Sequence, residues 1–132
     1  EQQVHVDVVC VACCETPLHL ACRSPVLYHG PTRGLNVVKY LVEVGHASVE
    51  ALDEDKDTPL HNASYHGNLQ VVQYLIEERH ANIRARNKKG FTPFDLAYRC
   101  DQIETIRYLL PLYDGDIALD EYMLQTAFLK SF

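Results

Sequence analysis

The chain has 132 residues, of which 47% are hydrophobic and 23% charged, and its formal net charge is −6 at pH 7. This composition excludes a disordered chain, and the acidic surplus argues against a protein that binds the phosphate backbone of nucleic acids. No apolar run is long enough to cross a bilayer, and we expect no signal peptide, because no basic segment precedes an apolar one.

The cysteines predict free thiols rather than a disulfide framework. Cys10, Cys13, Cys14 and Cys22 crowd into the first quarter of the chain, and Cys100 stands alone. A secreted disulfide scaffold usually has an even and dispersed set of cysteines. We therefore expect a reducing compartment and a cytoplasmic or nuclear protein.

One short element occurs three times along the chain. It reads TPLHLA at 16–21, TPLHNA at 58–63 and TPFDLA at 92–97. Its Thr suits the N-cap of a helix, its Pro suits the first helical position, and Leu or Phe with Ala supply an inward face. The pattern predicts a helix after each Thr. In the third copy Asp95 replaces His, and we expect the bracing that His gives to its own turn to be lost.

A second helix is predicted after each copy. The segments 35–42, 69–76 and 103–110 match one another and carry apolar residues at helical spacing over about three turns. Tyr40, Tyr74 and Tyr108 share one position, and we expect their rings to lie over the back of the fold with hydroxyls that reach water.

These paired motifs resemble the ankyrin repeat over nearly the whole chain. The resemblance implies an all-α solenoid of stacked helix-turn-helix units, each preceded by a β-turn finger. Compared with that family, this chain has one extra residue per repeat, near 44–46 and 78–80. The predicted division is a finger or cap at 1–15, repeat 1 at 16–52 with an inserted loop at 23–34, repeat 2 at 53–86, repeat 3 at 87–120, and a degenerate repeat or capping helix at 121–132.

The inserted loop accounts for the longer step from Thr16 to Thr58. It is rich in Gly and Pro, which break helices. A surface insertion of this kind is tolerated, because lengthening a loop costs little entropy. The alternative is a contact loop that uses Leu27, Tyr28 and His29.

The resemblance implies that another protein binds the concave surface formed by the fingers and first helices. Adjacent fingers carry opposite charge, which indicates either mutual attraction of two exposed loops or a charge-complementary groove that orients a partner segment. Tyr65 and Phe91 are the predicted aromatic anchors, unless Tyr65 packs against its own finger. The full predicted contact set is Leu52, Glu54, Asp55, Asp57, Tyr65, His66, Arg86, Lys88, Lys89, Phe91 and Arg99.

A zinc site is the strongest competing chemistry. Cys10 and Cys13 have zinc-ligand spacing, and Cys14, His19 or Cys22 could complete a site. However, His19 belongs to the repeated element, Cys22 is expected to be a small buried hydrophobe, and no second ligand pair follows. We expect no metal, no cofactor and no catalytic residues.

The predicted function is therefore a non-enzymatic protein–protein interaction module or scaffold. Nucleic acids, membranes and small-molecule substrates are not expected as partners. The alternative is a targeting or regulatory ankyrin segment of a larger enzyme, a ligase adaptor or a host-delivered bacterial effector, with catalysis outside this chain. A metal-dependent fold built on an N-terminal zinc site is the third hypothesis.

Overall fold

The computed structural model describes residues 14–23 and 33–113, and this part of the chain is helical and contains no strand. Its elements are α1 (Pro17–Arg23), α2 (Arg33–Glu43), α3 (Pro59–Tyr65), α4 (Leu69–Glu77), α5 (Pro93–Arg99), α6 (Ile103–Leu109) and the 3₁₀ helix η1 (Leu110–Tyr113). No helix in these two ranges has the length and apolar character needed to span a membrane.

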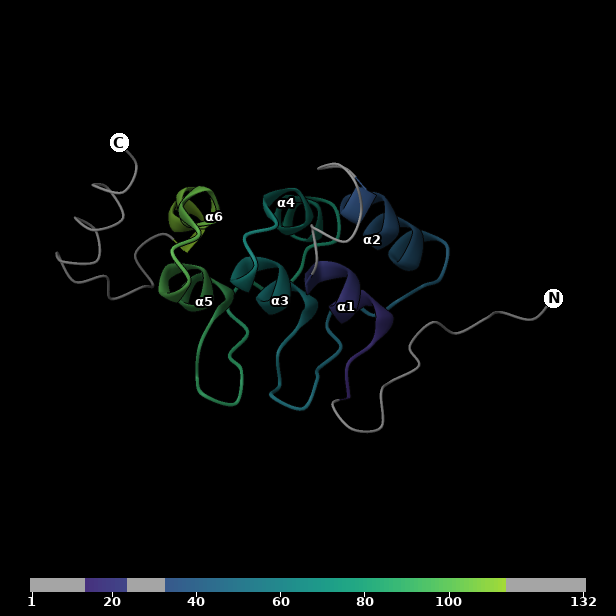
Figure 1. Ribbon diagram of the computed structural model, residues 1–132, viewed down its shortest axis with the longest axis horizontal. Helices are drawn as coiled ribbons and strands as arrows, with labels where there is room; N and C mark the ends of the chain where they lie inside the picture. Colours follow the sequence, from purple (N-terminus) through teal and green to yellow (C-terminus); the bar gives the residue numbers. More distant parts are fainter. Residues whose placement is uncertain (1–13, 24–32, 114–132) are drawn as a thin grey trace, which may run out of the picture.

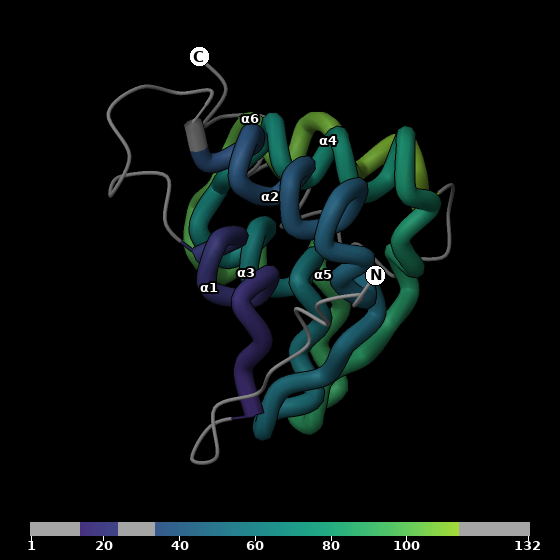
Figure 2. Tube along the Cα trace, turned by 90° about the vertical axis from the view of Figure 1, so that its right-hand side faces the viewer, coloured from purple at the N-terminus to yellow at the C-terminus, as the bar shows by residue number. Residues whose placement is uncertain are grey.

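The helices form two layers, as Figure 1 shows. Helices α1, α3 and α5 make one layer, and α2, α4 and α6 make the other. The loops before α3 and α5 project from the first layer, away from the second, and Figure 2 shows the same arrangement after a quarter turn. Helix α3 packs against both α1 and α5, while α4 packs against α2 and α6. The predicted all-α solenoid is confirmed.

The repeated element supplies the core between the layers. Leu18, Leu60 and Phe94 occupy one position of the element and are at most 1% exposed. The small Ala63 and Ala97 are fully buried, which lets neighbouring helices approach closely. Because each copy packs against the next, the core runs along the stack rather than around one centre.

The histidine of the element links each helix to the following finger. The Thr58 hydroxyl accepts from the His61 backbone N–H at 3.3 Å, and the Thr58 N–H donates to His61 Nδ1 at 3.1 Å. His61 Nε2 then donates to the carbonyl of Phe91 at 2.9 Å. Since Nδ1 accepts from a backbone N–H, the imidazole is held in its neutral Nε2–H form.

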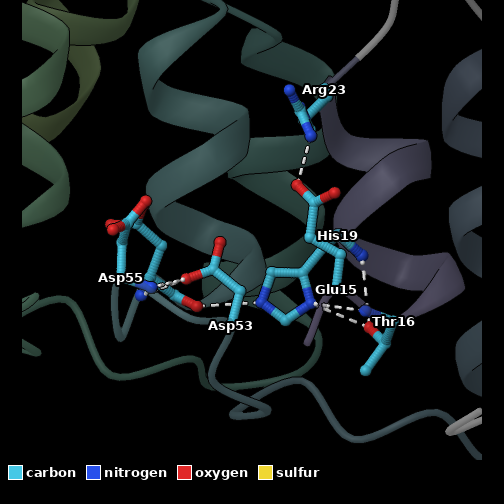
Figure 3. A network of polar contacts seen from close by, with 7 residues as sticks. Glu15, Thr16, His19, Arg23, Asp53 and Asp55 are labelled. Atoms are coloured by element: carbon cyan, nitrogen blue, oxygen red, sulfur yellow. Dashed lines mark hydrogen bonds and ion pairs between the residues drawn. The ribbon is translucent and has the colours of Figure 1, made fainter. Parts of the chain in front are cut away.

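The first repeat has the same arrangement. His19 Nδ1 lies 3.2 Å from the Thr16 backbone nitrogen, and Nε2 lies 2.8 Å from the carbonyl oxygen of Asp57. Figure 3 shows His19 between Thr16 and the finger that carries Asp53 and Asp55. Each histidine therefore joins two successive repeats.

Asp95 corrects one expectation. Its carboxylate accepts from the Thr92 N–H at 2.9 Å and from the Thr92 hydroxyl at 3.1 Å. The bracing of the helix start, which we expected to be lost, is kept, because a carboxylate oxygen can accept the bonds that Nδ1 accepts elsewhere. A carboxylate has no counterpart to the Nε2–H donor.

The buried His61 predicts a pH-dependent stability. Burial lowers the pKa of His61 below its ordinary value of 6.5, although its bond to the Phe91 carbonyl opposes this shift. As the pH falls, His61 therefore takes up a proton in the unfolded chain before it does so in the folded chain. The stability that is present above about pH 6.5 is then lost, by at most about 1.4 kcal/mol per pH unit. We expect the difference in unfolding free energy between wild type and His61→Asn, which does not titrate, to shrink from about pH 7.5 to about pH 5.5. A constant difference in urea titrations would contradict this prediction.

The shared tyrosine is a contact between outer helices. The Tyr74 hydroxyl donates to Glu43 of α2 at 3.0 Å, and Tyr74 is only 4% exposed. Burial and this bond raise the pKa of Tyr74 to about 12. Tyr108 is likewise hydrogen-bonded to Glu77 of α4, whereas Tyr40 is 63% exposed. For Tyr74, the expectation of a hydroxyl that reaches water was wrong, because the preceding outer helix supplies its partner.

The connections between helices show one smaller difference from expectation and one feature that was not predicted. The helices reach into both ends of the segment 23–34 that was predicted to be loop, because Arg23 completes the second turn of α1 and α2 begins at Arg33. After α2 and α4, where an extra residue was expected, His46 and His80 adopt left-handed conformations with φ of 56° and 55°. The predicted contacts Leu27, Tyr28 and His29, the cysteines Cys10 and Cys13, and the segment 121–132 lie outside the described residues.

Candidate protein-binding surface

Two fingers, which we call finger 2 (residues 53–57) and finger 3 (residues 87–91), share one turn geometry. The Asp53 carboxylate accepts from the backbone N–H groups of Asp55 and Asp57, both at 2.9 Å. The Asn87 side-chain oxygen accepts from the N–H groups of Lys89 and Phe91, both at 3.0 Å. These bonds fix each finger tip without help from a partner.

Each finger turns through a left-handed residue just before its last position. Gly90 has φ of 85° in finger 3, and Lys56 has φ of 59° in finger 2. Cys14, with φ of 56°, occupies the same place before Thr16. Only glycine adopts this conformation at no steric cost.

Replacing Lys56 with glycine is therefore expected to stabilise the fold. The gain in the free energy of unfolding should be about 0.5–1 kcal/mol. The reciprocal change Gly90→Ala should cost a similar amount, and this cost reports the backbone alone, because a Cβ at Gly90 meets nothing within 4 Å. Urea denaturation measures the free energy of unfolding of both variants. A change in the same direction for Lys56→Gly and Gly90→Ala would contradict the steric cost that we assign to a side chain at these left-handed positions.

Hydrogen bonds hold the two fingers side by side as one unit. The Lys88 N–H donates to the Asp55 carbonyl at 2.8 Å, and the Asn87 amide donates to the Asp57 carboxylate at 2.9 Å. Within the described ranges, no ion pair joins the fingers. Burial raises the pKa of Asp57, and the bond from Asn87 opposes that shift. Hydrogen bonds rather than direct ion pairs thus join the fingers, and the side chains of Lys88 and Lys89 are exposed.

A groove of about 260 Å³ lies between these fingers and the helices α3 and α5. It brings together the predicted residues Asp55, Asp57, Tyr65, Lys88, Lys89, Phe91 and Arg99. It also contains Asn62, Asn87 and Leu96, which the sequence analysis did not identify. The groove thus combines exposed aromatic, basic and acidic side chains within one hollow.

The residues that were missed carry a periodic signal. Asn62 and Leu96 occupy the same position of the repeated element, one turn before Tyr65 and Arg99. Side chains three residues apart lie on one face of a helix, so each would share the face of a residue that was identified. Asn87 corresponds to Asp53, since both hold the turn of a finger.

A comparison of the sequence with family models gave a result that agrees with this architecture. Residues 3–83 and 26–120 match the model described as ankyrin repeats (3 copies). The chain belongs to the ankyrin-repeat family. Ankyrin repeats are generally protein–protein interaction modules, and the groove lies on the finger side of this ankyrin stack. A comparison with curated proteins found no match.

Four predicted contacts of the ankyrin domain lie outside the groove: Leu52, Glu54, His66 and Arg86. Leu52 is 52% exposed, and Glu54 is exposed at the finger tip. Arg86 donates to the Gly90 carbonyl at 3.0 Å and so braces its own finger. Partial burial and the nearby Arg23 lower the pKa of His66, whose ring meets the Tyr65 ring edge-on at 4.9 Å.

The two aromatic anchors are placed differently. The Arg99 guanidinium lies 4.5 Å from the centre of the Phe91 ring, so Phe91 already forms a cation–π contact within the ankyrin domain. Tyr65 is 48% exposed, which leaves much of its ring open. Tyr65 is therefore the more accessible of the two anchors.

Several of the atoms that could bind a metal in this ankyrin domain are buried or already hydrogen-bonded. Both ring nitrogens of His19 are engaged by Thr16 and Asp57, and Cys22 is fully buried, which raises the pKa of its thiol. The carboxylates of Asp53, Asp55 and Asp57 lie within 4.8 Å of one another. These three could offer oxygen ligands to a cation, but Asp53 already accepts the two backbone bonds that shape finger 2.

Proposed function

We propose that this ankyrin-repeat chain is a non-enzymatic interaction module that binds a segment of another protein in the groove that fingers 2 and 3 form with the helices α3 and α5. The observation that carries this proposal is the gathering of Tyr65, Arg99 and the two finger lysines in one hollow. Aromatic and arginine side chains dominate the binding energy of protein interfaces, and a hollow lets them be shielded from water on binding.

The charges of the groove favour an orienting role. Lys88 and Lys89 stand on finger 3, while Asp55 and Asp57 stand on finger 2. Exposed charges of this kind affect association rate and orientation more than they affect stability. A partner segment would therefore be captured in one direction.

The same proposal includes a cytoplasmic or nuclear location and a role as a scaffold. It is supported by Cys14, Cys22 and Cys100, which are free thiols in the described part of the chain. Thiols remain reduced in these compartments.

Reversal of charge on finger 3 tests the proposed surface. The double variant Lys88→Glu/Lys89→Glu should capture at least about tenfold less partner from a lysate of the source cells, while its thermal midpoint stays within about 2 °C of wild type. Arg86 is kept, because it braces finger 3.

A matched control carries the same change in charge elsewhere. Arg79→Glu/Arg107→Glu alters exposed sites after α4 and on α6, outside the groove. This control should capture as much partner as wild type. Equal capture by wild type and the finger 3 variant would move the binding surface away from the groove.

A further inference from the structure

We infer that the groove takes an extended peptide segment with a single acidic side chain beside a large apolar one. This inference rests on the proposed function and names the chemistry of the partner. The acidic side chain meets Lys89 and Arg99, the apolar one meets Tyr65, and the main chain of the peptide hydrogen-bonds to Asn62.

Asn62 is the first support, because its side-chain Nδ2 is a buried donor that no described residue pairs. It lines the groove, is 8% exposed, and its Nδ2 has no hydrogen-bond partner among the described residues. Buried polar groups are almost always paired, and an unpaired one weakens the fold. The other repeats have Leu20 and Leu96 at this position, so the fold itself accepts an apolar side chain there.

The chemistry of an amide indicates an extended peptide. A carboxamide can both donate and accept, as can a peptide group. An extended main chain presents free N–H and C=O groups, whereas a helix uses its own internally. Asn62 can therefore pair with an extended segment at the base of the groove.

The charges of the groove favour an acidic side chain. Within the described part of the chain, Lys88, Lys89 and Arg99 form no ion pair. On finger 2, Asp57 accepts a hydrogen bond from Asn87, and Asp55 remains exposed. A single carboxylate can approach the basic side, but a run of acidic residues would also meet Asp55 and be repelled.

The apolar side chain has its own place beside these cations. Tyr65 leaves 48% of its surface exposed, and Leu96 lines the same groove from α5. An aliphatic or aromatic side chain laid on these two residues would remove apolar area from water. The groove therefore selects an acidic side chain together with a large apolar one, rather than an acidic side chain alone.

Selection from a random-peptide library on phage, against the full chain, tests this inference. We expect enriched peptides to share one Asp or Glu beside a large apolar residue. Selection against Lys89→Glu/Arg99→Glu should instead enrich Lys or Arg at the acidic position. Enrichment of peptides that lack an acidic residue, or a failure to enrich any, would overturn the inference.

The variant Asn62→Leu separates binding from folding. The best synthetic peptide should bind it at least about fivefold more weakly in fluorescence polarisation, while its thermal midpoint equals or exceeds that of wild type. The matched control Leu20→Asn alters the same position of the first repeat, outside the groove, and should leave affinity unchanged. Equal affinity of Asn62→Leu and wild type would overturn the role of Asn62.

The two proposals can fail separately. If the finger 3 charge reversal abolishes capture of a cellular protein but no peptide is enriched, the interaction surface stands and the peptide inference falls. If the reversal leaves capture unchanged, the proposed surface itself is wrong.

Discussion

Replacing Phe94 with alanine is expected to lower the free energy of unfolding by about 3–5 kcal/mol. Phe94 is 1% exposed in α5, and its ring centre lies 5.6 Å from that of Tyr113. Truncation would leave a cavity where the last described repeat packs on the stack. Since stacked repeats are stabilised by their neighbours, this loss should spread beyond α5. Urea denaturation followed by circular dichroism measures the effect.

Phe91 is the matched control, because it lies only three residues away but faces the groove. Phe91→Ala should cost about 1 kcal/mol or less, since it removes mainly the contact with Arg99. It should also weaken partner binding, whereas Phe94→Ala should affect binding only through folding. Similar losses of stability in the two variants would contradict this division between core and surface.

Replacing His61 with leucine is expected to cost about 2–4 kcal/mol. The imidazole is fully buried and joins the start of α3 to the carbonyl of Phe91 in finger 3. Leucine would leave the Thr58 N–H without its acceptor and would remove one of the two donors of the Phe91 carbonyl, which still accepts from the Asn87 N–H at 2.9 Å. Urea denaturation should show the loss, and protease digestion should show an earlier cut in finger 3.

His61→Asp provides a control that copies the third repeat, where Asp95 holds Thr92. It should retain the bonds at the helix start and lose only the one to finger 3, so its cost should be about half that of His61→Leu. Equal costs for the two variants would contradict this division and show that the link to finger 3 contributes all of the effect.

The fold could be predicted from local patterns because they repeat. Thr, Pro and the buried Leu or Phe of each element act within one turn of helix, and the paired helices follow at a fixed step. The link from His61 to the next finger could not be predicted in this way, because its acceptor is a backbone carbonyl that any residue would supply. The role of Asp95 was misjudged for a related reason, since a carboxylate and Nδ1 accept the same bonds.

The binding surface was predicted less completely. Position within a finger indicates exposure, which is why Lys88, Lys89 and Phe91 were identified, but it does not indicate direction. Arg86 was therefore predicted as a contact with a partner, although its guanidinium bonds to the carbonyl of Gly90 in its own finger. Asn62 was missed because it stands within the repeated element, and its unpaired Nδ2 is seen only in the structure.

The position of the partner is tested most directly by photo-crosslinking from two tyrosine sites. A photoreactive phenylalanine analogue is placed in the full chain either at Tyr65, in the groove, or at Tyr40, on the outer helix α2, where the side chain is 63% exposed. We predict that illumination in cells crosslinks a partner protein from position 65 and that Lys88→Glu/Lys89→Glu removes this crosslink. A partner crosslinked from position 40 and not from position 65 would contradict binding in the groove.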